Sequence, residues 1–120
     1  MYQIIFYTDI NEKSEVYEYI LNLRNKNNKD NKIKLNKITA YINQLSKYGL
    51  SIGEPYIKHL DGEIWELRPL RDRILFAYFS NNKFILLNQF MKQTQKTAQR
   101  EIDKAKRFLN DYKKRNDENG

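Results

Sequence analysis

Three short runs of β-branched and aromatic residues constrain the fold more than any other feature of this chain. They occupy residues 64–68, 73–79 and 84–90, and they lie close together. The intervening residues 69–72 and 80–83 have the polar, Pro- and Asn-containing composition of tight turns. Strands joined by such short turns pair antiparallel. The sequence therefore predicts an antiparallel meander in the second half of the chain.

The alternation of side chains predicts how this meander is covered. In an extended strand successive side chains point to opposite faces. Trp65 and Leu67 should therefore share one face, and Ile64, Glu66 and Arg68 the other. The run 73–79 is apolar on both faces, which predicts a central strand that is covered on both sides.

The segment before the meander predicts a strand and then a helix. Residues 2–7 are short, β-branched and aromatic, as in a strand. Asp9, followed three residues later by Glu12, has the spacing of a capping box and predicts that a helix begins there. This helix should pack through a stripe of apolar residues at helical spacing, Val16, Tyr19, Ile20 and Leu23.

A second helix should follow and pair with the first. Residues 24–34 are rich in Asn and Lys and predict a solvated turn. The apolar stripe of the second helix is Leu35, Ile38, Ile42 and Leu45. Gly49 stands where a left-handed C-cap residue is expected, and residues 50–57 should form a connector. The apolar faces of this helical hairpin need a cover, which the sheet can supply.

One more helix is expected after the meander. Thr97 is a candidate cap, and the stripe consists of Ala98, Ile102, Ala105, Leu109 and Tyr112. Residues 113–120 are charged and predict a mobile tail. We therefore expect one α+β domain over residues 1–112, ordered strand, helix, helix, antiparallel meander, helix, with the helices packed on a small, mostly antiparallel sheet.

Composition narrows the class of partner. The chain has 120 residues, no cysteine and a formal net charge of +7. The positive charge favours a polyanionic partner, although it also serves solubility. No apolar run has the roughly 18–20 residues needed to span a bilayer, and the N-terminus lacks the features of a secretory signal. A cytoplasmic protein without a membrane partner is expected.

Arginines on either side of the first predicted turn are the first candidate functional residues. Arg68 and Arg73 lie at opposite ends of a turn between adjacent strands, so their guanidinium groups can come together. A guanidinium is permanently charged and binds phosphate oxygens in a bidentate manner. Arg71 in the turn is a possible third contact. The alternative is that one of these arginines forms a surface ion pair with Glu66 or Asp72.

Basic and polar residues after the last strand are the second group of candidates. Lys92 is a candidate for proton transfer or for neutralising phosphate charge, and Lys96 is a further cation. Thr94 and Gln95 between them can hydrogen-bond to a phosphate or a base. The alternative is an ordinary polar loop before a helix.

His59 and Tyr78 each have both a functional and a structural interpretation. His59, the only histidine, lies next to Lys58 and is a candidate acid or base, or else a structural residue. Tyr78 can stack on a base or pack in the core. With no cysteine, one histidine and no Gly-rich phosphate loop, the sequence offers no metal or cofactor site, and none is expected.

Three motifs in register carry a family resemblance. They are L-x-G-x-I-W-E-L-R at 60–68, R-I-L-F at 73–76, and F-x-K-x-T-x-K-T-x-x-x-E-I-x-x-A at 90–105. Together with the predicted order of elements, they resemble the HigB-like, phage Gp49-related branch of the RelE/ParE toxin superfamily. The resemblance covers nearly the whole chain.

This resemblance implies the toxin of a type II toxin–antitoxin pair. RelE- and HigB-type members cleave mRNA, usually in the ribosomal A site, without a metal, whereas ParE-type members share the fold and poison DNA gyrase. The expected partner is a small HigA-like helix-turn-helix antitoxin, through which the complex reaches operator DNA. For mRNA cleavage, the resemblance and the cation pattern assign Arg68, Arg73 and Lys92 to the chemistry. RNA contacts are expected from Lys58, His59, Arg71, Thr94, Gln95 and Lys96.

Overall fold

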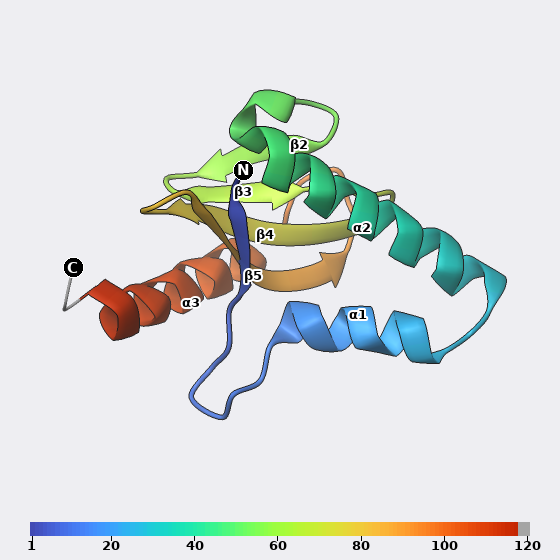
Figure 1. The fold of residues 1–120 in the computed structure, drawn as a ribbon, viewed down its shortest axis with the longest axis horizontal. Coiled ribbons are helices and arrows are strands. Elements are labelled where there is room, and N and C mark those ends of the chain that lie inside the picture. The colour runs from blue at the N-terminus through green and yellow to red at the C-terminus, as the bar shows by residue number, and fades with distance from the viewer. Residues whose placement is uncertain (118–120) are drawn as a thin grey trace.

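The computed structural model describes residues 1–117, and within them five strands form one sheet that is covered by three α-helices (Figure 1). The elements are β1 (Gln3–Phe6), α1 (Glu15–Asn25), α2 (Lys29–Tyr48), the 3₁₀ helix η1 (Gly49–Ile52), β2 (Ile57–Asp61), β3 (Ile64–Leu67), β4 (Asp72–Phe79), β5 (Lys83–Met91) and α3 (Gln99–Asp117).

The sheet has the order β1-β5-β4-β3-β2. Strands β2 to β5 form the expected antiparallel meander, extended by one strand. β1 pairs with β5 in the parallel direction, with Gln3 opposite Lys83. The structure confirms an α+β fold on a mostly antiparallel sheet, consistent with a RelE-like fold.

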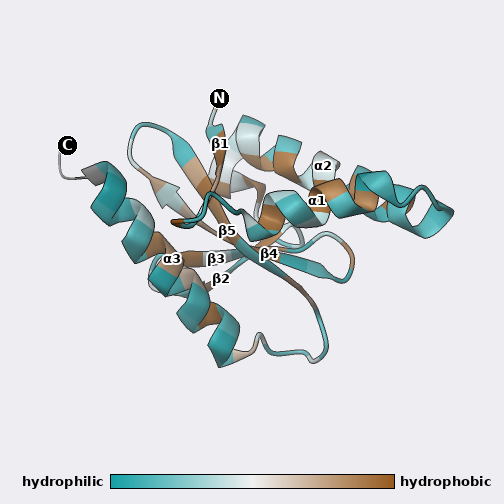
Figure 2. Cartoon of the chain, turned by 90° about the horizontal axis from the view of Figure 1, so that it is seen from below, coloured by the Kyte–Doolittle hydropathy of each residue, from teal (hydrophilic) through white to brown (hydrophobic). Residues whose placement is uncertain are grey.

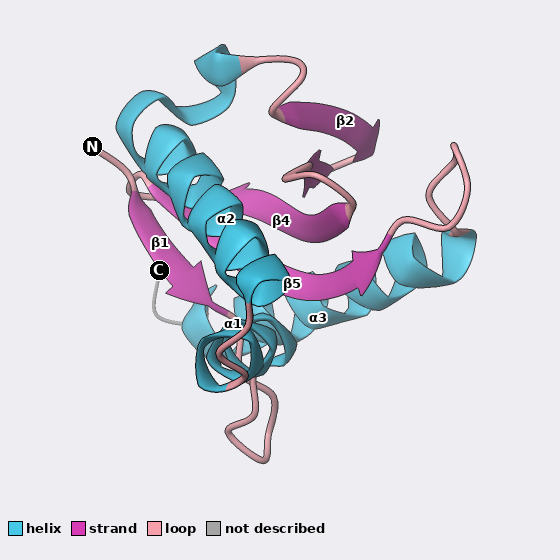
Figure 3. Cartoon of the chain, turned by 90° about the vertical axis from the view of Figure 1, so that its right-hand side faces the viewer, coloured by secondary structure: helices cyan, strands magenta, loops and turns pink. Residues whose placement is uncertain are grey.

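Helices cover both faces of the sheet. α1 and α2 lie on one face and α3 on the other (Figure 3). The apolar bands of the helices face the strands, while their outer surfaces are hydrophilic (Figure 2). Trp65 and Leu67 pack toward α1 and α2, whereas Ile64 packs toward α3. The predicted alternation of this strand is confirmed, as is the central position of β4, which is buried on both faces.

A β-bulge in β5 changes which side chains reach the α3 face. Leu75 pairs with Asn88 but Phe76 pairs with Leu86, so Leu87 is an extra residue in the strand. Such a bulge reverses the alternation beyond it. As a result, Asn88 and Phe90 lie on the α3 face, and Phe90 stands opposite Arg73.

The start of α1 differs from the prediction. The Asp9 carboxylate accepts hydrogen bonds from the backbone N–H groups of Asn11 and Lys13, at 2.8 and 3.0 Å. It therefore closes a turn of its own instead of capping the helix. α1 begins at Glu15, and the hydroxyl of Ser14 caps it by accepting from the N–H of Tyr17.

The turn between the first two helices is shorter than predicted. α2 begins at Lys29, where the side chain of Asn28 caps it, so much of the polar segment 24–34 is helical. The predicted cap at the other end is confirmed, because Gly49 follows α2 with a φ of 64°. A side chain there would also collide with the ring of Tyr2, since an added Cβ would lie 2.7 Å from it.

Three further features differ from the prediction. The connector ends at residue 56, and Ile57–Asp61 forms β2, an edge strand that the sequence analysis did not predict. The hydroxyl of Thr97 does not cap α3 but donates to Glu66. Residues 113–117 of the predicted tail continue α3, where Lys113 forms an ion pair with Glu63 at 2.6 Å. The rest of that tail, 118–120, lies outside the described residues.

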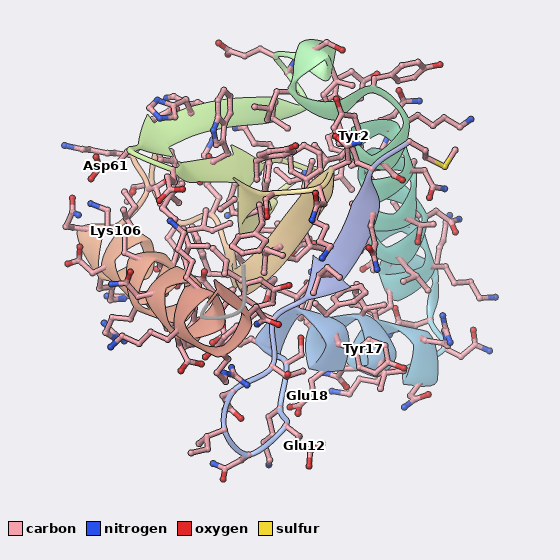
Figure 4. The ribbon with its side chains drawn as sticks, turned by 60° about the vertical axis from the view of Figure 1, so that its left-hand side comes forward. Tyr2, Glu12, Tyr17, Glu18, Asp61 and Lys106 are labelled. Atoms are coloured by element: carbon pink, nitrogen blue, oxygen red, sulfur yellow. The ribbon has the colours of Figure 1, made fainter. Side chains whose placement is uncertain are left out.

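Ion pairs fasten α3 against the sheet. Lys106 contacts Asp61 at 2.5 Å, and Figure 4 shows these two side chains approaching each other from α3 and from the end of β2. The hydroxyl of buried Tyr7 donates to Asp111 on α3, at 2.7 Å. This helix forms one wall of the site described below, so these contacts help to set its position.

The Tyr7 contact predicts a loss of stability at alkaline pH. Burial, followed by the hydrogen bond to Asp111, raises the pKa of Tyr7 from 10.0 to about 12. The native state therefore keeps this proton when the unfolded state has lost it. The contribution of the protonated Tyr7 hydroxyl to stability is complete below pH 10 and is lost as the pH rises to 12. Between pH 8 and 11 the wild type should lose about 1.4 kcal/mol more free energy of unfolding than Tyr7→Phe. Urea unfolding at both pH values measures this, and equal losses in the two proteins would contradict it.

Candidate active site

A cavity of about 280 Å³ opens at one end of the sheet, on the α3 face. Its walls are the ends of β3, β4 and β5, the loop 92–98, and the first turn of α3. Four of the lining residues are cationic and two are acidic. The cations are Arg73, Lys92, Lys96 and Arg100, and the acids are Glu66 and Glu101. This is the charge balance of a site for an anion.

A buried carboxylate lies beneath the cavity. Glu66 on β3 is only 2% exposed. One of its oxygens accepts a hydrogen bond from the Thr97 hydroxyl at 2.5 Å. The other lies 3.5 Å from Nε of Arg68 and 3.9 Å from Nε of Arg73. Since a buried charge needs a partner, Glu66 keeps two guanidinium groups close together and ties the loop before α3 to the sheet.

Arg73 is fixed by the turn that precedes β4. Its Nη1 donates to the carbonyl oxygens of Leu70 and Asp72, each at 2.8 Å. The residue is 6% exposed, and burial lowers the pKa of the guanidinium while Glu66 raises it. Arg73 therefore both supports the turn and contributes charge to the cavity wall.

Arg68 approaches Glu66 without lining the cavity. Its Nε is buried and has no hydrogen-bond partner among the described residues. The prediction that Arg68 and Arg73 lie close together agrees with the geometry. Both arginines also pair with Glu66, as the alternative expected for one of them, but the carboxylate that they share is buried and not on the surface.

Two hydrogen bonds join the turn to the loop after β5. The N–H of Lys92 donates to the carbonyl of Arg71 at 2.7 Å, and Nη2 of Arg71 donates to the carbonyl of Lys92 at 3.1 Å. These two bonds place the side chain of Lys92 against both the turn and the cavity. They do not engage its ammonium group.

The loop 92–98 presents the other expected contacts. Thr94, Gln95 and Lys96 all line the cavity and are exposed. The Thr94 hydroxyl donates to the carbonyl of Lys96 at 2.8 Å, which leaves its oxygen free to act as an acceptor only.

Buried polar contacts hold the first turn of α3 against the cavity. Asn88 on β5 is fully buried, and its amide nitrogen donates to the backbone oxygen and to Oε1 of Glu101, at 3.2 and 3.1 Å. Lys104 contacts Glu101 at 3.7 Å and Glu15 at 3.0 Å, which joins α3 to the start of α1. Glu101 is therefore engaged by structural contacts.

The remaining predicted residues do not all reach the cavity. In the strand register, Lys58 on β2 stands opposite Glu66 on β3, which places it on the cavity side of the sheet. His59 pairs with Trp65 on the opposite face, packs edge-on against that ring with a centroid distance of 5.0 Å, and hydrogen-bonds to the carbonyl of Gly62. This favours the structural alternative for His59. Tyr78 is 42% exposed near the far end of β4, so it is neither in the cavity nor a core aromatic.

Two residues of the site, Glu66 and Arg100, were not among the predicted contacts. Glu66 looked like an exposed acid on an alternating strand, and only the approach of Thr97 and the two arginines reveals its burial. Arg100 follows Lys96 by four residues, a spacing that can place two cations along one wall. Within residues 1–117 no group of three or more His, Cys, Asp or Glu residues has a geometry able to hold a metal ion.

A family model matches most of this chain. The model of the "Phage derived protein Gp49-like" family matches residues 18–110, which span α1 to the C-terminal half of α3 and include every cavity residue. No curated protein matches the chain. Since the match covers well over half of the sequence, the chain belongs to the phage-derived Gp49-like family, which is related to the RelE- and HigB-type toxins.

Proposed function

We propose that this protein is the toxin of a type II toxin–antitoxin pair and cleaves mRNA on the ribosome. The observation that carries the proposal is the convergence of Arg73, Lys92, Lys96 and Arg100 on one cavity beside two further cations, Arg68 and Lys58. The family relationship connects the chain to toxin–antitoxin systems, and the cavity supplies the chemistry for a phosphodiester.

The reaction we propose is an attack by a ribose 2′-oxygen on the adjacent phosphorus. A bond forms between O2′ and phosphorus, and the bond to the 5′-oxygen of the next nucleotide breaks. The 2′-hydroxyl proton is removed and a proton is delivered to the leaving oxygen, so the products are a 2′,3′-cyclic phosphate and a 5′-hydroxyl end. Negative charge develops on the phosphorane oxygens, where fixed cations stabilise the transition state most.

The geometry suggests different roles for the cations. Lys92 reaches the cavity with its ammonium group free to contact a phosphate, because the structural bonds of Lys92 use only its backbone. Arg100 lines the same cavity with its Nε 3.9 Å from the Glu101 carboxylate, so it adds charge to the wall. Arg73 is committed to two carbonyls, so it acts through position and charge. Lys92 is our choice for neutralising the phosphorane or transferring a proton, and no metal is needed for this chemistry.

The proposed partners follow from the same assignment. A HigA-like helix-turn-helix antitoxin would neutralise the toxin and carry the complex to operator DNA. The acting form would work in the cytoplasm on ribosome-bound mRNA, to which the formal charge of +7 is suited. No helix in residues 1–117 is long and apolar enough to cross a membrane.

Programmed ribosomes test the proposal directly. The purified protein should cut mRNA in the ribosomal A site and leave 5′-hydroxyl ends, in the presence of EDTA at a level that keeps ribosomes intact. Primer extension maps the cuts. A supercoiling assay with DNA gyrase is run in parallel, because a ParE-type activity would leave the mRNA intact and trap cleaved DNA. That second result would overturn the proposal.

A further inference from the structure

A second hollow adjoins the cavity on the far side of Lys92. It has a volume of about 270 Å³ and is lined by Leu70, Arg71, Lys92 and Gln93. Lys92 and Gln93 line both spaces, so a group bound in one lies next to a group bound in the other. Volumes of a few hundred Å³ suit a small planar group such as a nucleobase.

Leu70 in this hollow has an unusual conformation. Its φ is 57°, in the left-handed region that favours glycine or asparagine, and its apolar side chain is 48% exposed. A leucine is not needed for this conformation, because glycine would fit the backbone better and a polar side chain would be better solvated. Strained backbone conformations are often found at functional sites.

The turn that carries Leu70 is held from several directions. Arg73 donates to its carbonyl at 2.8 Å, the N–H of Asp72 donates to the carbonyl of Pro69 at 3.0 Å, and Arg71 exchanges two bonds with Lys92. The Arg71 guanidinium is thereby oriented although the residue is exposed. A fixed guanidinium plane, an apolar side chain and the amide of Gln93 are the groups that bind an unstacked base, by stacking and by hydrogen bonds to its edge.

We propose that this hollow binds the RNA base next to the scissile phosphate and that Leu70, Arg71 and Gln93 determine which base is accepted. The proposal rests on the proposed function, because it assumes that the first cavity, on the other side of Lys92, binds the scissile phosphate. A nucleotide whose phosphate contacts Lys92 in the cavity places a neighbouring base across that side chain. Leu70 and Arg71 contact the base faces, and the Gln93 amide reads the edge.

The sharpest test is Leu70→Gly, because glycine relieves the strained backbone and keeps the protein folded. Programmed ribosomes carry a series of mRNAs that differ only in the bases of the A-site codon. The wild type should prefer one base over the poorest by about tenfold or more. Leu70→Gly and Gln93→Ala should reduce that preference to within about threefold, while thermal unfolding shows Leu70→Gly to be at least as stable as the wild type. Leu50→Ala, which removes another exposed leucine on η1, is the matched control and should keep the preference.

A second readout separates this proposal from the proposed function. A single-stranded RNA with a 2′-deoxy residue at the cleavage position and 2-aminopurine beside it reports stacking through its fluorescence. The wild type should change that fluorescence and Leu70→Gly should not, with about tenfold weaker binding. If the wild type stacks the base but never cuts mRNA, the base site stands and the proposed function fails. If Leu70→Gly keeps both the base preference and the stacking signal, or if the RNA does not bind, the base site is overturned.

Discussion

Replacing Lys92 with alanine should lower the rate of mRNA cleavage about 100- to 1000-fold, the range expected when one charged donor is removed from a transition state. The protein should stay folded, because the structural bonds of Lys92 come from its backbone N–H and carbonyl, which alanine also has. Single-turnover cleavage on programmed ribosomes measures the rate, and circular dichroism checks the fold.

Two further variants give the Lys92 result a precise meaning. Lys37→Ala makes the same change in charge at an exposed position on α2 and should cleave at the wild-type rate. Lys92→Arg keeps the charge but cannot give up a proton at neutral pH. If Lys92→Arg restores cleavage, the residue acts by neutralising charge, and if it does not, the residue transfers a proton. Wild-type cleavage by Lys92→Ala would exclude Lys92 from the chemistry.

Replacing Glu66 with glutamine should lower the free energy of unfolding by about 3 kcal/mol, which is typical when one member of a buried ion pair loses its charge. Arg68 and Arg73 would then face each other without their shared carboxylate, in a position where Glu66 is 2% exposed. Urea unfolding measures the loss. Sulfate should restore part of it, because an anion that binds only the folded state between the guanidinium groups stabilises that state.

Glu63→Gln provides the matched control for Glu66. It removes the same charge from the adjacent β2–β3 turn, where Glu63 pairs with Lys113 at 2.6 Å but is 58% exposed. Exposed pairs contribute about 0–1 kcal/mol, so this variant should be nearly as stable as the wild type. It should gain no more stability from sulfate than the wild type does, which corrects for the general stabilising effect of this salt. Equal stability of the two variants would show that the Glu66 carboxylate does not hold the two arginines together.

The meander could be predicted from the sequence because its signals are local. Alternation within 64–68 and the turn composition of 69–72 and 80–83 need no knowledge of distant residues, and the structure follows them. The predicted start of α1 was wrong because two side chains near it can cap a backbone N–H group. The Asp9 carboxylate accepts hydrogen bonds within its own turn, and Ser14 caps the helix. The edge strand β2 was not predicted because its pairing with β3 specifies it more than its own residues do.

The site could be predicted only in part, for a related reason. Arg73, Lys92 and Lys96 were found because cations near strand ends are visible in the sequence. The bulge at Leu87, which places Phe90 beside Arg73, depends on the pairing register between two strands. The burial of Glu66 depends on Thr97, which lies 31 residues later in the chain. Such long-range contacts leave no local pattern.

The parallel pairing of β1 with β5 has a consequence for how the protein is made. Gln3 on β1 pairs with Lys83 on β5, so the nascent chain cannot add β1 to the sheet until β5 has been synthesised. Contacts of such high sequence separation slow folding, because the entropy of closing the loop must be overcome before they form. The cavity residues Lys92, Lys96 and Arg100 are synthesised later still. A chain that terminates before the end of β5 therefore carries neither a complete sheet nor the assembled cation cluster.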